Sequence, residues 1–267
     1  MTDYVAPAMM TDPGEHKALF DGLPADPAGI ARVVQGLMVH EFWADRYDLS
    51  LTDDQKQTVH LRKTADLLSA IVALDDRPLT EAREPAQRIA TNCRGFTVLA
   101  VAMLRHAGVP ARARCGFGAY FNPGKFEDHW VVEYLDGGRW RLLDAQIDPL
   151  QRDVLKIEFD LTDVPRDEFV IADDAWQRCR AGRDDPDDYG LSPIGESGLW
   201  WVAGNLMRDS AALQNVEVLP WDCWGEMPEP GQQPDVALFD PMAAGERPAE
   251  IPDEVFNALR QRVEPLR

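Results

Sequence analysis

Three residues whose side chains can work together in nucleophilic catalysis occur along the chain in the order Cys93, His129 and Asp144. A cysteine attacks as its thiolate, a histidine beside it can take and return the proton, and a carboxylate can hold that imidazole in the required tautomer. Such a set would perform acyl transfer on an amide or a thioester through a covalent Cys-linked intermediate. This chemistry requires elements that bring the three side chains together.

Cys93 stands just before an apolar run, Phe96–Leu104, which reads FTVLAVAML and predicts a helix that is buried on all sides. Gly108 and Pro110 supply the signals that end such a helix. Cys93 is therefore expected in the first helical turn, where unsatisfied N–H groups and the helix dipole favour the thiolate. The backbone N–H of Cys93 is the expected donor to an oxyanion.

His129 and Asp144 lie in two β-branched and aromatic runs around Asp136-Gly137-Gly138, a pattern typical of a β-hairpin. A two-residue turn would place Val131 opposite Asp144, so that His129 and Asp144 become diagonal neighbours on one face. A three-residue turn would send them to opposite faces. The sequence thus permits a Cys93–His129–Asp144 triad, and the register of the hairpin decides it.

These segments, NCRGFTVLAVAMLRHAGVPARARCGFG and DHWVVEYLDGGRWRLLDAQIDP, resemble the core of the transglutaminase-like superfamily. The shared pattern is a Cys at a helix start, then Gly-hydrophobic-Pro-Ala-Arg, a His at a strand start and an Asp on the next strand. It covers about residues 88–149. One departure is that Trp130 follows His129 directly, where many members have a small residue between them.

The resemblance implies a papain-like fold, with Cys93 as nucleophile, His129 as general base and Asp144 as the residue that orients the imidazole. Papain-like proteases also place a side-chain oxyanion donor six residues before the nucleophile. Gln87 has that spacing here, and its alternative interpretation is an ordinary surface residue.

The pattern of elements predicts an α+β fold, in which the buried helix carrying Cys93 packs on an antiparallel sheet with helical additions at both ends. We expect a single domain over 1–267. About 26–150 would form the helical N-terminal part and the core, and about 151–267 an acidic, Trp-rich extension. Four tryptophans of that extension could wall an acyl pocket or simply fill a core: Trp200, Trp201, Trp221 and Trp224.

Outside the core, helices are predicted over about 27–46 and 52–74, the second starting with a Thr52–Gln55 capping box. His40 and His60 would lie on these helices as satisfied residues without metal-ligand spacing. Further expected elements are a strand over 112–120, a strand over 154–159, a short helix from Asp173, a helix over 195–213, coil over 226–252 and a last helix over 252–263.

The formal charge of −19 argues against nucleic acid or an anionic membrane as partner. Cysteines at 93, 115, 179 and 223 show no C-x-x-C spacing, and Cys115 is expected to be a buried core thiol, so we expect no metal and no cofactor. The segment MTDYVAPAMMTDPGEH predicts no signal peptide, and no apolar run suits a membrane helix. A cytoplasmic location is the expectation.

Three functions remain open. The first is a cysteine enzyme that hydrolyses, deamidates or transamidates an amide of a small molecule, peptide or protein. The second is an arylamine-type acyl-CoA amine acyltransferase, which uses the same residue order but has an Arg-Gly-Gly-x-Cys approach that is absent here. The third is a non-catalytic binding or scaffold module on the same fold. Loss of a triad residue would favour the third, and none is lost.

Overall fold

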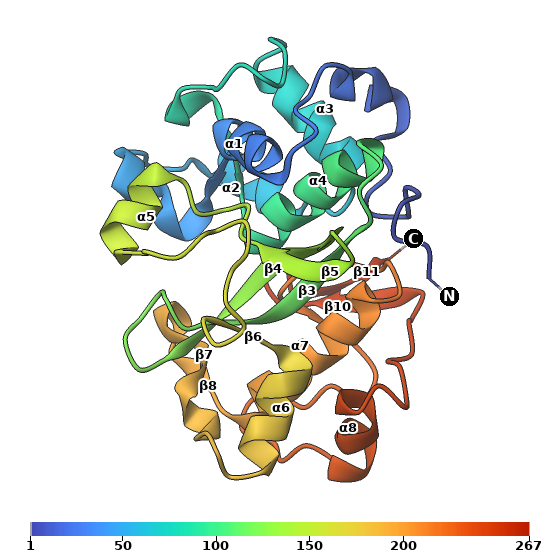
Figure 1. The fold of residues 1–267 in the computed structure, drawn as a ribbon. Helices are drawn as coiled ribbons and strands as arrows, with labels where there is room; N and C mark the ends of the chain where they lie inside the picture. The colour runs from blue at the N-terminus through green and yellow to red at the C-terminus, as the bar shows by residue number, and fades with distance from the viewer. Residues whose placement is uncertain (1, 267) are drawn as a thin grey trace. The chain divides into compact units, whose positions relative to one another are not determined.

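The computed structural model describes residues 2–266, and these group into two compact units (Figure 1). The first unit contains the chain up to Ala113 together with Val131–Val164, and the second contains Arg114–Trp130 and the chain from Pro165 onward. The chain changes unit inside two strands, β3 (Ala111–Gly118) and β4 (Phe126–Asp136). That residues 1–267 form a single domain stays a prediction.

Helices and strands both contribute, as the α+β expectation requires. The α-helices are α1 (Pro27–Leu37), α2 (Asp53–Gln57), α3 (Thr64–Leu74), α4 (Cys93–His106), α5 (Pro149–Leu155), α6 (Ala172–Arg180), α7 (Leu199–Ala212) and α8 (Val236–Ala243). The 3₁₀ helices are η1 (Gly14–Phe20), η2 (Glu41–Tyr47), η3 (Thr58–His60), η4 (Pro85–Gln87), η5 (Pro186–Asp188) and η6 (Ser192–Ile194). The remaining strands are β1 (Met38–His40), β2 (Ile89–Thr91), β5 (Arg139–Leu143), β6 (Phe169–Ile171), β7 (Tyr189–Leu191), β8 (Glu196–Ser197), β9 (Asp222–Cys223), β10 (Glu254–Asn257) and β11 (Arg262–Pro265).

Helix α4 is the centre of the first unit, and α1 and α3 pack against it (Figure 1). Every residue from Cys93 to Arg105 is buried, which confirms the helix buried on all sides that the apolar run predicts. The N-cap Asn92 accepts a hydrogen bond from the Gly95 N–H, and Gly108 takes a positive φ of 80° just after the helix. In the second unit α6, α7 and α8 pack on one another.

Strand β5 pairs antiparallel with β4 in the first unit, with Asp136 opposite Arg139, so Gly137 and Gly138 form the two-residue turn. Both glycines have positive φ, 57° and 83°, as a tight hairpin turn requires. In the second unit the strand order is β6-β3-β4-β7-β8, and the β4–β7 pair is parallel while the β3–β6 and β7–β8 pairs are antiparallel. Strands β9, β10 and β11 form a separate antiparallel sheet.

Two of the predicted N-terminal helices are shorter in the structure. The helix expected over 27–46 ends at Leu37, because Met38–His40 pairs in parallel with β2. The Thr52–Gln55 capping box is confirmed, but the helix it starts ends at Gln57. There the Thr58 hydroxyl approaches the main-chain oxygens of Gln55 and Ala90, 2.7 and 2.6 Å away, which ties this turn to a neighbouring strand.

Three other expectations are wrong. Residues 154–159 form no strand, because Val154 and Leu155 end α5, a helix that Asp148 caps and whose first position Pro149 occupies. The helix expected over 252–263 is the β10–β11 hairpin, whose first strand alternates exposed and buried residues. The coil expected over 226–252 contains α8.

The helix expected from Asp173 is confirmed as α6. The helix expected over 195–213 is confirmed as α7 over Leu199–Ala212, whereas Glu196–Ser197 before it form strand β8. No helix within residues 2–266 combines the length and the apolar character that a membrane crossing needs.

Candidate active site

Cys93 is the first residue of α4, the position that the sequence predicts. The N-cap Asn92 holds this turn from both sides, because its Oδ1 accepts from the Gly95 N–H at 3.2 Å and its Nδ2 donates to the Val59 carbonyl at 3.0 Å. Cys93 itself is 7% exposed, so a reagent has only a small opening through which to reach its side chain. A thiol at a helix N-terminus is stabilised as the thiolate, which is the nucleophilic form.

Gly95 allows the first turn of α4 to lie directly against β2. A Cβ atom at this position would overlap Thr91 Oγ1 and would lie 3.2 Å from Thr91 Cβ. Thr91 is buried and ends β2, only two residues before the nucleophile. The close contact between Thr91 and Gly95 therefore fixes the direction in which the chain enters the helix at Cys93.

Asp144 follows β5 and is 1% exposed. The last paired residues of the hairpin are Val132 and Leu143, and the same register continued by one residue sets Asp144 opposite Val131, as the two-residue turn predicts. Its Oδ1 accepts hydrogen bonds from the main-chain N–H groups of Gln146 at 2.9 Å and Ile147 at 3.3 Å. These bonds hold one oxygen of the carboxylate in a fixed turn.

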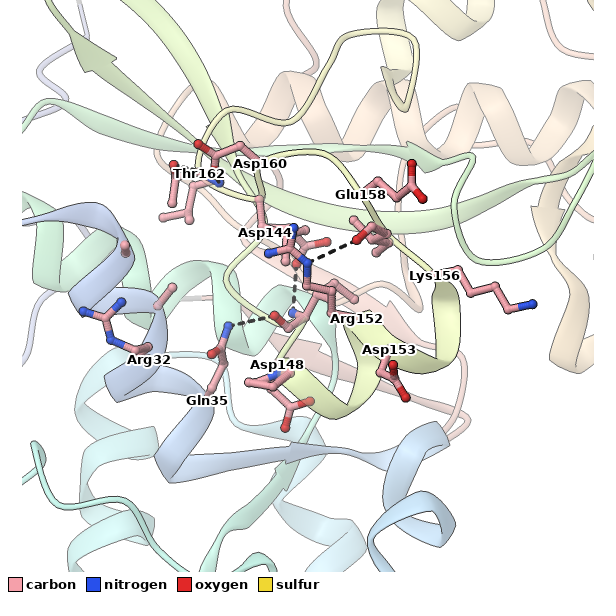
Figure 2. A pocket seen from close by; sticks show the side chains of 17 residues that line it. Arg32, Gln35, Asp144, Asp148, Arg152, Asp153, Lys156, Glu158, Asp160 and Thr162 are labelled. Atoms are coloured by element: carbon pink, nitrogen blue, oxygen red, sulfur yellow. Dashed lines mark hydrogen bonds between the residues drawn. The ribbon is translucent and has the colours of Figure 1, made fainter.

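An open groove of about 850 Å³ lies beside this turn, between α1 and the segment 143–162 (Figure 2). Across it, Gln35 of α1 donates to the Ile147 carbonyl at 3.0 Å, and Arg152 donates to the Ile157 carbonyl at 3.1 Å. The Gln35 bond braces the loop that carries Asp144, and the Arg152 bond closes the turn that follows α5. Gln35 holds the same residue whose N–H reaches the Asp144 carboxylate.

His129 lies on β4 in the second unit and is 2% exposed. Three aromatic rings of that unit meet its imidazole edge to face: Phe121 at a centroid distance of 4.8 Å, Tyr120 at 6.1 Å and Phe169 at 6.2 Å. A Cβ atom at Gly118 would lie 2.7 Å from the Phe121 ring, so the glycine makes room for that ring. The aromatic rings fix the plane of the imidazole and limit its contact with water.

The neighbouring carboxylate Asp128 is engaged elsewhere. It accepts a hydrogen bond from Trp201 Nε1 of α7 at 2.9 Å. Burial raises the pKa of Asp128, and the Arg208 charge and the Trp201 hydrogen bond oppose that rise. Sequence reasoning assigned Asp128 no role, although strand alternation signals that its side chain and that of His129 point to opposite faces.

The remaining cysteines, Gln87 and the tryptophans of the extension differ in how deeply they are buried. Cys115 is fully buried in β3, as expected, and burial raises the pKa of the Cys179 thiol to about 12. Gln87 is exposed on η4, which is typical of a surface residue. Among the four tryptophans of the extension, Trp224 is buried and the other three are half-buried. No three acidic, histidine or cysteine side chains within residues 2–266 are grouped as metal ligands.

His40 differs from its prediction. It ends strand β1 instead of lying on a helix, and it pairs with Thr91 of β2. The short apolar segment Met38-Val39 before His40 is the signal that could have predicted this strand, because such a segment is compatible with either a helix or a strand. Cys93, Asp144 and His40 belong to the first unit, and His129 belongs to the second.

Residues 52–145 match the model of the transglutaminase-like superfamily. No curated protein matches the chain. Among solved structures, a crystal structure of a proposed cysteine protease from Cytophaga hutchinsonii is similar at 16% identity with a TM-score of 0.36. That alignment covers 63% of this chain and 44% of the other, so the chain spans less than half of that protein. The family match spans Cys93, His129 and Asp144 and supports cysteine-based catalysis.

Proposed function

We propose that the chain, which carries a transglutaminase-like core over residues 52–145, is a cysteine-dependent acyl-transfer enzyme that acts on an amide or a thioester. The observation that carries this proposal is the position of Cys93, largely buried at the first turn of helix α4, which is buried from Cys93 to Arg105. The hairpin register supports Asp144 as the orienting carboxylate, because strand alternation gives His129 the same face of β4 as Val131, the residue opposite Asp144.

In this mechanism the Cys93 thiolate attacks the substrate carbonyl carbon, and the Cys93 N–H stabilises the oxyanion that forms. His129 takes the thiol proton and then gives it to the leaving amine or thiol. Asp144 holds the imidazole so that the correct nitrogen faces the sulfur. The products of this half-reaction are an S-acyl enzyme and the protonated leaving group.

Water or an amine then attacks the thioester, which gives hydrolysis, deamidation or transamidation. The proposed substrate is an amide of a small molecule, peptide or protein. The arylamine-type acyltransferase is disfavoured because Ile89-Ala90-Thr91-Asn92 precedes the nucleophile in place of Arg-Gly-Gly-x. A scaffold module is disfavoured because the cysteine keeps its position at the helix start.

The test is intact-mass spectrometry of the protein after incubation with a panel of activated amides and thioesters. We expect one acyl adduct per chain with a competent donor, and no adduct in Cys93→Ala. Turnover of a genuine substrate at an unchanged rate by Cys93→Ala would refute the proposal, because the covalent intermediate would then have no role.

A further inference from the structure

His40 ends strand β1, which pairs with β2, the strand that leads into the helix of the nucleophile. Strand β1 pairs in parallel with β2, and the last pair of the register is His40 with Thr91. Strand β2 ends at Thr91, and the next two residues are the N-cap Asn92 and Cys93. His40 is therefore fixed by main-chain pairing beside the residues that lead into the first turn of α4.

The side chain of His40 shares its direction with that of Thr91. Residues in register on neighbouring strands project from the same face of the pair. The Thr91 side chain meets the first turn of α4, since a Cβ atom at Gly95 would overlap its Oγ1. The His40 imidazole, 8% exposed, therefore projects toward the same turn, which is the one that carries Cys93.

The hydrogen bond at Nδ1 of the His40 ring determines which ring nitrogen carries the proton. His40 Nδ1 accepts from the Phe42 N–H at 3.1 Å. A main-chain N–H can only donate, so Nδ1 carries the lone pair and the proton of the neutral imidazole lies on Nε2. Protonation of Nδ1 would break the bond to Phe42. His40 is thus suited to donate through Nε2–H and poorly suited to accept a proton.

We propose that His40 is a catalytic residue whose Nε2–H donates to the oxyanion formed at Cys93. When the Cys93 sulfur bonds to the substrate carbon, the carbonyl π pair moves onto oxygen, and that negative oxygen accepts from His40 Nε2 and from the Cys93 N–H. No proton changes place at His40. When the carbonyl re-forms, the leaving group departs with the proton held by His129. The inference rests on the proposed function and adds a side-chain donor in place of Gln87.

Two conservative variants separate this role from a structural one. His40→Gln retains an N–H near the position of Nε2 but loses the acceptor for Phe42, whereas His40→Asn retains an acceptor near Nδ1 and loses the Nε2–H donor. We expect acylation to slow by roughly 10²-fold to 10³-fold in His40→Asn, the usual effect of removing one oxyanion donor, and by less than about 10-fold in His40→Gln. A structural role through Phe42 would reverse that order.

The second readout is the rate of Cys93 alkylation by iodoacetamide, which forms no oxyanion. We expect this rate and its pH profile to be unchanged in both variants and in the control His60→Gln. If His40→Asn slows alkylation as much as acylation, His40 acts on the thiol and the proposal is overturned. If His40→Asn acylates at the wild-type rate, it is also overturned. Failure of the proposed function itself would show differently, as turnover that survives Cys93→Ala.

Discussion

The substitution Gly95→Ala tests how tightly the entry to the active-site helix is built. The added Cβ would overlap Thr91 Oγ1 and lie 3.2 Å from Thr91 Cβ, which is closer than ordinary van der Waals contact. Thr91 is 2% exposed, so its side chain has little room to turn away. The strain should therefore fall on the main chain between Thr91 and Cys93, which sets the position of the sulfur.

Two effects of opposite sign determine the magnitude. Inserting a methyl group into a packed core costs about 1–3 kcal/mol in the free energy of unfolding. Replacing glycine by alanine inside a helix returns up to about 1 kcal/mol through the higher helix propensity of alanine. The net expectation is a loss of about 1–2 kcal/mol for Gly95→Ala. Removing Oγ1 with Thr91→Ala should relieve the overlap. The loss in the free energy of unfolding should therefore be smaller in the double variant than the sum of the losses in the two single variants.

Denaturant unfolding of the four proteins in this double-mutant cycle measures the coupling, and we expect about 1–2 kcal/mol of recovery. Gly204→Ala is the control, because the nearest atom to its Cβ would be the terminal Nη1 of the flexible Arg208 side chain, at 3.1 Å, and Met227 Sδ and Arg208 Cζ would lie at ordinary contact distances of 3.8 and 3.9 Å. The alkylation rate of Cys93 should fall in Gly95→Ala and recover in the double variant. If Gly95→Ala is as stable as the wild type and shows no coupling to Thr91, the reasoning about this contact is refuted.

Three further predictions follow from the same site. Limiting iodoacetamide at neutral pH should label Cys93 before Cys223 and well before Cys115 and Cys179, as peptide mapping would show; first labelling of Cys223 would contradict the helix-terminus argument. With a competent donor, adduct formation should be at least ~10²-fold slower in His129→Ala than in the wild type. Asp144→Asn should also form the adduct more slowly, while its circular dichroism shows that it stays folded. An unchanged rate in His129→Ala would remove His129 as the base from the mechanism. Burial raises the pKa of Glu41 from 4.5 to about 7, so the folded state holds this proton more tightly than the unfolded state. As the pH rises from about 4.5 to 7, the free energy of unfolding of the wild type should fall relative to that of Glu41→Gln by at most about 3 kcal/mol, with no further change above. Denaturant unfolding of both proteins over this pH range measures the difference. Equal pH dependence of the two proteins would contradict the shift.

The features that sequence predicts correctly are those encoded within a few neighbouring residues. The apolar run behind Cys93 predicts the helix start there, and the structure confirms that start, with Asn92 as the N-cap. For the hairpin the sequence leaves a two-residue and a three-residue turn open, and the structure has the two-residue turn Gly137-Gly138 with both glycines at positive φ. The position of Asp144 opposite Val131 is a consequence of that turn.

The features that sequence misses depend on partners far along the chain. Strand β1 exists because Met38–His40 pairs with residues about fifty positions later, and the helical pattern around it gives no sign of that partner. Thr58 ends a predicted helix through a contact with Ala90. Phe169 reaches His129 from forty positions away. Tertiary pairing of this kind overrides local propensity, which is why helix lengths and the surroundings of His129 were not predictable.

The two buried histidines illustrate how the local bond partners of a ring set what it can do. His40 has its Nδ1 bound to a main-chain donor, so its neutral tautomer is fixed and the ring offers only a proton on Nε2. His129 meets the rings of Phe121, Tyr120 and Phe169 edge to face, and such contacts restrain the plane of its imidazole. A general base must both accept and release a proton during each turnover, whereas an oxyanion donor must do neither. The Nδ1 bond of His40 therefore favours His40 as the proposed oxyanion donor over a role as general base, which the proposed mechanism gives to His129.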